Sequence, residues 1–141
     1  VDLAAVVGFA LVVVADDLYG GSYRLFSKIL PGYDVRFTYV DATRPEEVAK
    51  AITPETRMLW IESPTNPMLR LIDVAACAEI ARRHGAWLVV DNTFATPILQ
   101  TPVTQGATFV LHSGTKFLGG HGDVMAGVVA TTSAPVPSVN G

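Results

Sequence analysis

The chain has little charge and almost no cysteine. Only 16% of its 141 residues are charged, and 13 acidic residues against 10 basic ones give a net charge of −3 at pH 7. Without a basic excess, the sequence predicts no surface for nucleic acid or anionic lipid. The single cysteine, Cys77, excludes an intrachain disulfide framework and a multi-cysteine zinc site. We expect a small buried thiol there and no metal centre.

The amino-terminal apolar run is too short to cross a membrane. It covers residues 3–15, whereas a spanning helix needs ~20 apolar residues, and Asp2 stands where a secretory signal would carry basic residues. We therefore predict no membrane association and a cytoplasmic location. The run is expected to form an irregular or helical lead-in and then a buried strand. Residues 133–141, rich in Pro and Ser, are expected to form a flexible tail.

Short β-branched runs alternate with helical patterns along the chain. Strands are predicted at residues 11–15, 35–40, 57–62, 86–91, 108–112 and 126–131. Helical patterns lie between most of them, including one that begins after Asp73, a favourable N-cap. Strands that are almost wholly apolar indicate a mostly parallel sheet with helices on both faces, which is an α/β fold.

Polar side chains directly follow four of these strands, at residues 16–19, 62–66, 91–93 and 112–116. Because open α/β sheets bind ligands beyond the carboxyl ends of their strands, we expect these residues to meet at one site. The three histidines are given no catalytic role. His112 is expected to pack or to bond to main chain, His121 to belong to a glycine loop and His84 to end a helix.

Lys116 permits three interpretations. A phosphate-binding Walker loop needs Gly directly before the lysine, where this chain has Thr115. A dinucleotide loop needs a G-x-G-x-x-G pattern, which residues 119–122 do not provide. A solvated surface lysine is the simplest alternative. The apolar neighbours of Lys116 instead favour a desolvated, neutral amine that can form a Schiff base.

Asp91 ends an apolar strand, where a carboxylate is rarely buried without a partner. It either caps the next segment or directs a fixed negative charge at a protonated ring nitrogen. Pyridoxal phosphate chemistry needs a lysine for the Schiff base, an acid at the pyridinium nitrogen and hydroxyl groups at the phosphate. Lys116, Asp91 and the hydroxyls of Ser113 and Thr115 offer this combination.

Four motifs resemble those of a known enzyme family: DLYGGSYRLF at 17–26, ESPTNP at 62–67, VDNTFATP at 90–97 and HSGTKFLGGHGD at 112–123. Together they resemble the pyridoxal-phosphate-dependent enzymes of cysteine and methionine metabolism, in particular the cystathionine γ-synthase and γ-lyase branch. The similarity covers about residues 12–132. It implies the large cofactor domain of the aspartate-aminotransferase-like (type I) fold, with a mostly parallel sheet flanked by helices.

The resemblance implies catalytic roles for Lys116 and Tyr19 and a cofactor-binding role for Asp91. Lys116 would carry the cofactor as a Schiff base and move protons, and Asp91 would pair with the pyridinium nitrogen. Tyr19 would stack on the cofactor ring and assist proton transfer; a packing aromatic is its alternative interpretation.

It also implies that Thr93 supports the ring and that Ser113 and Thr115 hold the phosphate. Asn66 would lie by the phenolic oxygen of the cofactor or by the substrate carboxylate. A turn residue is the alternative interpretation of Asn66, because it precedes a proline.

The implied function is pyridoxal-phosphate-dependent γ-replacement or γ-elimination on homoserine-derived or sulfur amino acids, in transsulfuration. Methionine γ-lyase, cystathionine β-lyase and homoserine-ester sulfhydrylase activities are alternatives, as is a non-catalytic fragment. The partners implied are a small amino-acid substrate and, for a full-length chain, further copies in a homotetramer, a dimer of dimers. The family's phosphate loop, amino-terminal arm and carboxylate-binding domain are not recognisable in this sequence. We therefore expect residues 1–141 to be one truncated, incomplete cofactor domain.

Overall fold

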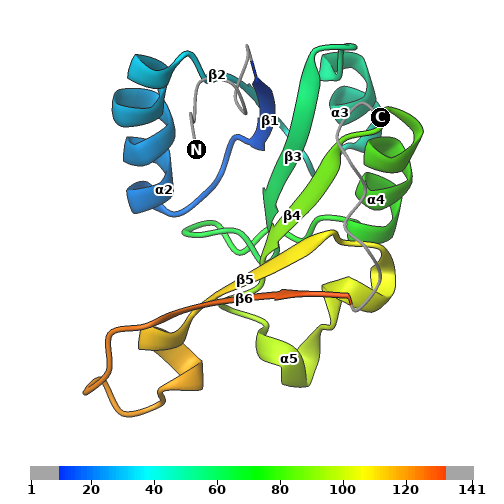
Figure 1. The fold of residues 1–141 in the computed structure, drawn as a ribbon. Coiled ribbons are helices and arrows are strands. Elements are labelled where there is room, and N and C mark those ends of the chain that lie inside the picture. Colours follow the sequence, from blue (N-terminus) through cyan, green and yellow to red (C-terminus); the bar gives the residue numbers. More distant parts are fainter. Residues whose placement is uncertain (1–9, 133–141) are drawn as a thin grey trace.

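The computed structural model describes residues 10–132, which form a six-stranded sheet with helices on both faces (Figure 1). The strands are β1 (Leu11–Ala15), β2 (Arg36–Val40), β3 (Thr56–Glu62), β4 (Trp87–Asp91), β5 (Phe109–Ser113) and β6 (Gly127–Thr131). Their order is β2-β1-β3-β4-β5-β6; β6 is antiparallel to β5, and every other pair is parallel. The predicted α/β class is confirmed, and no strand end departs from its predicted position by more than one residue.

The longer helices lie where the sequence patterns indicate, and two short helical elements are additional. They are α2 (Gly20–Arg24), which continues through helical turns over Leu25–Ile29 and Leu30–Tyr33, α3 (Pro45–Ala51), α4 (Val74–Arg83) and the short α5 (Thr96–Leu99). The carboxylate of Asp73 accepts the N–H of Ala76 at 2.9 Å, which confirms the predicted N-cap of α4. The sequence analysis did not predict α5 or the turn over Pro102–Gln105.

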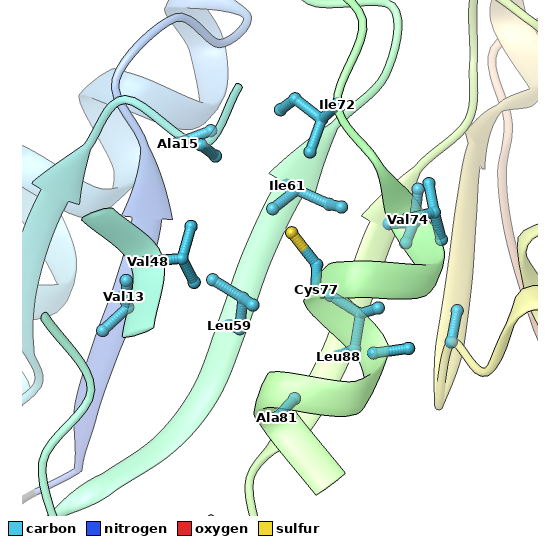
Figure 2. Packing of buried hydrophobic residues seen from close by; sticks show 14 of the residues in the cluster. Val13, Ala15, Val48, Leu59, Ile61, Ile72, Val74, Cys77, Ala81 and Leu88 are labelled. Carbon is cyan, nitrogen blue, oxygen red and sulfur yellow. The ribbon is translucent and has the colours of Figure 1, made fainter. Parts of the chain in front are cut away.

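Both faces of the central strands are buried. One core cluster joins the sheet to α3 and α4 and includes Leu59, Ile61 and Leu88 (Figure 2). The other lies beneath α2 and its continuation, where Phe26 stacks on Phe37 with ring centroids 5.0 Å apart. Since successive side chains of a strand point to opposite faces, burial on both sides explains why these strands read as continuous apolar runs.

Cys77 lies in the first of these clusters and is fully buried, as predicted. Burial raises the pKa of its thiol to about 12, with a smaller contribution from Asp73. The thiolate is the reactive form of cysteine, so this side chain packs and does no chemistry.

The expectations for the lead-in and for the tail at residues 133–141 lie outside the described residues. Over residues 10–132, no helix is both long enough and apolar enough to cross a membrane. The same part of the chain holds no group of three or more His, Cys, Asp or Glu side chains that could bind a metal ion.

The topology brings the four polar segments to one edge of the sheet. β1, β3, β4 and β5 are parallel neighbours in this order, so their carboxyl ends lie side by side. Glu62 and Asp91 are paired in register at the ends of β3 and β4. Segments separated by up to about a hundred residues along the chain thus become neighbours at this edge.

Candidate active site

A cavity of about 510 Å³ opens at the carboxyl edge of the sheet. All seven site residues singled out in the sequence line it: Tyr19, Asn66, Asp91, Thr93, Ser113, Thr115 and Lys116. Glu62 and Phe94 complete part of its wall. The fold therefore brings together every residue predicted for the site, although their individual roles stay predictions.

A second cavity, of about 460 Å³, lies between α4 and the start of β5. Alanines line much of it, and its charged residues Glu79 and Arg82 already pair with each other at 2.9 Å. Chemistry-bearing side chains converge at the first cavity and not at this one, so we assign the site to the carboxyl edge.

Asp91 is held in place by the turn that follows β4. Its Oδ1 accepts the N–H of Thr93 at 3.0 Å and the Thr93 hydroxyl at 2.6 Å. Thr93 Oγ1 in turn accepts the N–H of Ser113 at 2.8 Å, which links the ends of β4 and β5. The carboxylate therefore caps the next turn, as one interpretation expected, and also borders the cavity. Capping fixes its orientation, so the two interpretations are compatible.

Lys116 lies in a single helical turn, Gly114–Leu118, directly after β5. The main chain closes tightly around it, because the N–H of Gly120 donates to the carbonyl of Lys116 at 2.9 Å. The burial predicted from its apolar neighbours is wrong. Lys116 is exposed, and Phe117 is 63% exposed, because the turn projects from the sheet edge instead of continuing the buried strand.

Thr115 is engaged with the opposite side of the β5–β6 hairpin. Its Oγ1 accepts the N–H of Ala126 at 3.0 Å and donates to the carbonyl of Ala126 at 3.3 Å. A Cβ at Gly114 would lie 2.9 Å from the Cβ of Ala126, so this close approach requires glycine. A hydroxyl has one proton, and Thr115 must withdraw it from Ala126 before it can donate to a phosphate.

Tyr19 is fixed through its main chain and through its ring. Its N–H donates to Oε2 of Glu62 at 2.8 Å, and its carbonyl accepts the N–H of Tyr23 at 3.0 Å. The ring lies against Gly21, where a Cβ would overlap it. Half of Tyr19 is exposed, so it borders the cavity instead of packing in the core.

Glu62 belongs to a polar segment that the sequence analysis expected at the site, but it was given no role of its own. Its side chain is 5% exposed at the end of β3. Burial raises the pKa of this carboxyl to about 7, the N–H of Tyr19 opposes the shift, and the charges of Asp91 and Asp17 add to it. Its position at the end of an apolar strand was the available signal, since Asp91 occupies the equivalent position on β4.

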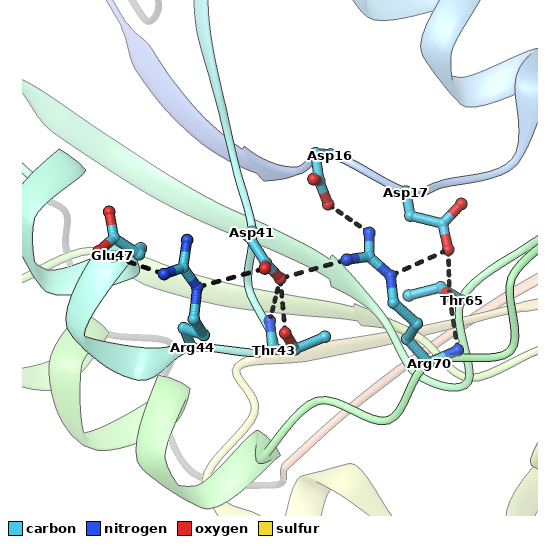
Figure 3. A network of polar contacts seen from close by, with 8 residues as sticks. All are labelled: Asp16, Asp17, Asp41, Thr43, Arg44, Glu47, Thr65 and Arg70. Carbon is cyan, nitrogen blue, oxygen red and sulfur yellow. Dashed lines mark hydrogen bonds and ion pairs between the residues drawn. The ribbon is translucent and has the colours of Figure 1, made fainter.

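Arg70 joins the chain segments that follow β1, β2 and β3 (Figure 3). Its guanidinium contacts Asp16 at 2.7 Å, Asp41 at 3.3 Å and Asp17 at 3.5 Å. The main-chain N–H of Arg70 donates to Oγ1 of Thr65 at 2.9 Å, and the Thr65 hydroxyl donates to the carboxylate of Asp17. The segment after β3 therefore fixes the segment that precedes Tyr19. Arg70 was also missed, because its partners are distant in sequence.

The sequence analysis expected no catalytic role for the histidines, and none of them is among the residues that line the cavity. His112 is buried on β5, and its Nδ1 has no hydrogen-bond partner among residues 10–132. His84 ends α4, where Nδ1 lies 2.8 Å from the carbonyl of Ile80. His121 belongs to the glycine loop.

This donor set matches pyridoxal phosphate. A capped carboxylate suits a pyridinium nitrogen, a lysine suits the aldehyde and a half-exposed aromatic ring suits the pyridine face. The glycine beneath the Tyr19 ring leaves that ring the space to lie at the cavity.

Comparison with known proteins agrees with this chemistry. The family model of the Cys/Met metabolism PLP-dependent enzymes matches residues 6–138. The chain belongs to this family.

Its relatives include enzymes with different reactions. The chain is 49% identical to a probable cystathionine gamma-synthase of Herpetosiphon aurantiacus, 52% identical to the cystathionine gamma-lyase of Bacillus subtilis and 48% identical to a cystathionine beta-lyase of Staphylococcus haemolyticus. The alignments cover 86%, 86% and 89% of this chain but 38%, 32% and 32% of the relatives. The chain thus spans about a third of their length.

Solved structures show the same fold. Cystathionine gamma-lyase from Lactobacillus plantarum, solved in complex with L-serine, superposes with a TM-score of 0.87 at 39% identity, over 93% of this chain and 35% of that one. MetB from Corynebacterium glutamicum also gives a TM-score of 0.87, at 44% identity, over 92% and 34%. The predicted family and its pyridoxal-phosphate-type fold are confirmed.

Proposed function

We propose that the protein acts, with pyridoxal phosphate, at Cβ or Cγ of homoserine-derived or sulfur amino acids, by γ-replacement or γ-elimination. The observation that carries this proposal is one cavity that joins Lys116, Asp91 and Tyr19 from three separate segments of the chain. Family membership and the relatives' printed activities support the class of reaction.

The cofactor supplies an electron sink for bonds broken at the substrate α-carbon. Lys116 would hold the aldehyde of the cofactor through Nζ, and its amine would accept and return protons at the substrate. Asp91 holds a proton at the pyridine nitrogen, which is why its fixed orientation matters. Tyr19 covers one face of the ring and excludes water from it, and Asn66 binds the phenolic oxygen or the substrate carboxylate.

The phosphate contacts complete the proposal. Ser113 and Thr93 are already joined by a hydrogen bond at the end of β5. Ser113 and Thr115 hold the phosphate, and Thr93 supports the ring. For Thr115 this requires its hydroxyl proton to turn from the carbonyl of Ala126 to the anion.

Similarity does not separate the possible reactions, because synthase, gamma-lyase and beta-lyase relatives are 49%, 52% and 48% identical to the chain. Methionine γ-lyase and homoserine-ester sulfhydrylase activities stay alternatives. Assembly as a homotetramer and a cytoplasmic location also stay predictions, to be tested by light scattering and by cell fractionation.

The exposure of Lys116 and the engaged hydroxyl of Thr115 favour a second candidate, a non-catalytic chain that binds the cofactor weakly. One experiment separates the two. Pyridoxal phosphate is added to the protein and to a Lys116→Ala variant, and visible absorption is recorded before borohydride reduction and peptide mapping. Lys50→Ala is the matched control, because Lys50 is an exposed lysine on α3.

Under the proposed function the protein shows a bound-cofactor band, reduction fixes the cofactor on Lys116, and only Lys116→Ala loses both signals. A band that survives in Lys116→Ala and maps to several lysines contradicts the proposal and favours the non-catalytic chain.

A further inference from the structure

Glu62 lies between two residues that border the cavity, Asp91 at the end of β4 and Tyr19 in the loop before α2. Its Oε2 accepts the main-chain N–H of Tyr19 at 2.8 Å across 43 residues of sequence. Glu62 is 5% exposed, whereas Tyr19 is 50% exposed. A buried carboxyl group thus fixes the main chain of a half-exposed aromatic residue.

Glu62 also lies beside Asp91. The two residues are paired in register on parallel strands, and both border the cavity. Neighbouring strands lie about 4.8 Å apart, so the two carboxyl groups leave the sheet close together. Like charges at this separation disfavour ionisation of both groups.

The two members of the pair differ in burial and in hydrogen bonding. Asp91 Oδ1 accepts two hydrogen bonds from Thr93. Glu62 accepts the single N–H of Tyr19 and is the more buried of the two. The charged groups that face it are Asp91 from β4 and Asp17 from the loop before α2, and both are acidic.

We propose that Glu62 is a positioning residue: it fixes the main chain of Tyr19 at the cavity and, as a buried carboxyl group that holds a proton, adds no negative charge beside Asp91. The positioning of Tyr19 by Glu62 concerns the protein alone. The role of the Glu62 proton rests on the proposed function, because it matters only where Asp91 faces the cofactor ring.

Two variants at Glu62 separate these roles. Glu62→Leu removes the acceptor at nearly constant volume, and Glu62→Gln keeps a carbonyl acceptor that cannot ionise. Hydrogen exchange of the Tyr19 amide is measured in the cofactor-free protein. The Asn92 amide, which donates to the carbonyl of Leu111 at 2.9 Å, reports on the sheet.

In Glu62→Leu the protection of the Tyr19 amide is expected to fall at least about tenfold, with Asn92 unchanged. In Glu62→Gln we expect Tyr19 to keep its protection within about threefold. Unchanged protection in Glu62→Leu overturns the proposal, and so does an equal loss at Asn92. Val48→Ala, a core truncation on α3, is the control for a general loss of stability.

The protonation of Glu62 beside Asp91 is tested by recording the visible absorption of bound pyridoxal phosphate as a function of pH. The protein is expected to show a spectral transition near neutral pH that Glu62→Gln lacks, and a transition retained in Glu62→Gln overturns the role of the Glu62 proton. If the unaltered protein binds no pyridoxal phosphate, the proposed function fails, while amide exchange still decides whether Glu62 positions Tyr19.

Discussion

Asp91 combines a structural contact and a charge in one side chain, and asparagine separates them. In Asp91→Asn the Oδ1 acceptor for Thr93 is kept, so the free energy of unfolding is expected to change by less than about 1 kcal/mol. The negative charge is lost, and a hydrogen bond to a charged group contributes about 1.5–3 kcal/mol. Affinity for pyridoxal phosphate, measured by absorption titration, is therefore expected to fall at least about tenfold. Equal affinity would show that Asp91 does not face the ring nitrogen.

Two adjacent glycines offer a test of the Tyr19 ring position. A Cβ at Gly21 overlaps the ring of Tyr19, whereas a Cβ at Gly20 meets no described atom within 4 Å. Gly20→Ala is expected to leave cofactor affinity unchanged and to add up to about 1 kcal/mol to stability, because alanine favours the helix. Gly21→Ala displaces the ring and weakens cofactor binding. Absorption titration of both variants checks this, and matching affinities would contradict it.

Glu62 makes stability depend on pH. Its pKa is about 7 in the folded chain and near 4.5 when exposed, so the folded state holds the proton more tightly. The free energy of unfolding therefore falls as pH rises from about 4.5 to 7, by ~3 kcal/mol for this group. Urea unfolding of the protein and of Glu62→Gln at pH 5 and pH 8 isolates the effect. The variant is expected to gain stability relative to the protein at pH 8; a constant difference between them contradicts the shift.

At the scale of elements, Arg70 joins the segments that follow β1, β2 and β3. Arg70→Met leaves three neighbouring aspartates without their cation and is expected to lower the free energy of unfolding by about 1–3 kcal/mol. Arg83→Met on α4 is the control, since the exposed pair of Arg83 with Glu79 is screened by solvent and adds little to stability.

The effect of Arg70→Met is expected to depend on pH in a defined direction. The Thr43 hydroxyl, with help from Arg70, holds the pKa of Asp41 below its ordinary value. Stabilisation from such a group is present above about pH 4 and is lost as pH falls through the folded-state pKa. The difference between protein and variant in urea unfolding should therefore shrink from pH 7 to pH 3. A difference that grows at pH 3 would contradict this account.

The strands were largely predictable, because a strand that is buried on both faces of the sheet needs apolar residues at successive positions, and the helices were predictable as the segments between them. The helix α5 was not, since its four residues offer too short a pattern. The sequence predicted which residues within the four motifs lie at the site, but it did not predict the contacts between one motif and another. Glu62 reads as a strand end and Gly21 as a helix start. Their roles appear only when the fold places both against Tyr19.

At the scale of the whole molecule, large apolar side chains lie open to solvent in the described part of the chain. Ile98 and Leu99 of α5 are 89% and 80% exposed, and Met125 is 94% exposed. Exposed apolar surface of this kind marks contacts with other protein. It agrees with the homo-oligomer predicted from the sequence, which stays a proposal.

Replacing Ile98 and Leu99 together by lysine is expected to lower the molar mass measured by light scattering, because two charges would be buried at any contact formed by α5. Lys28→Glu, a change at an exposed residue of the helical turn Leu25–Ile29, is the control. An unchanged mass in the double variant would place the contact elsewhere.

The β5–β6 hairpin also determines where the chain tolerates a change of length. Thr115 and Ala126 close the hairpin, and Gly119 and Gly120 donate back to Gly114 and Lys116 at 2.9 Å. These bonds hold the lysine turn without any main-chain bond from residues 121–125. Insertions at that tip should therefore leave the lysine in place, which makes the tip a suitable point for attaching a probe or a graft.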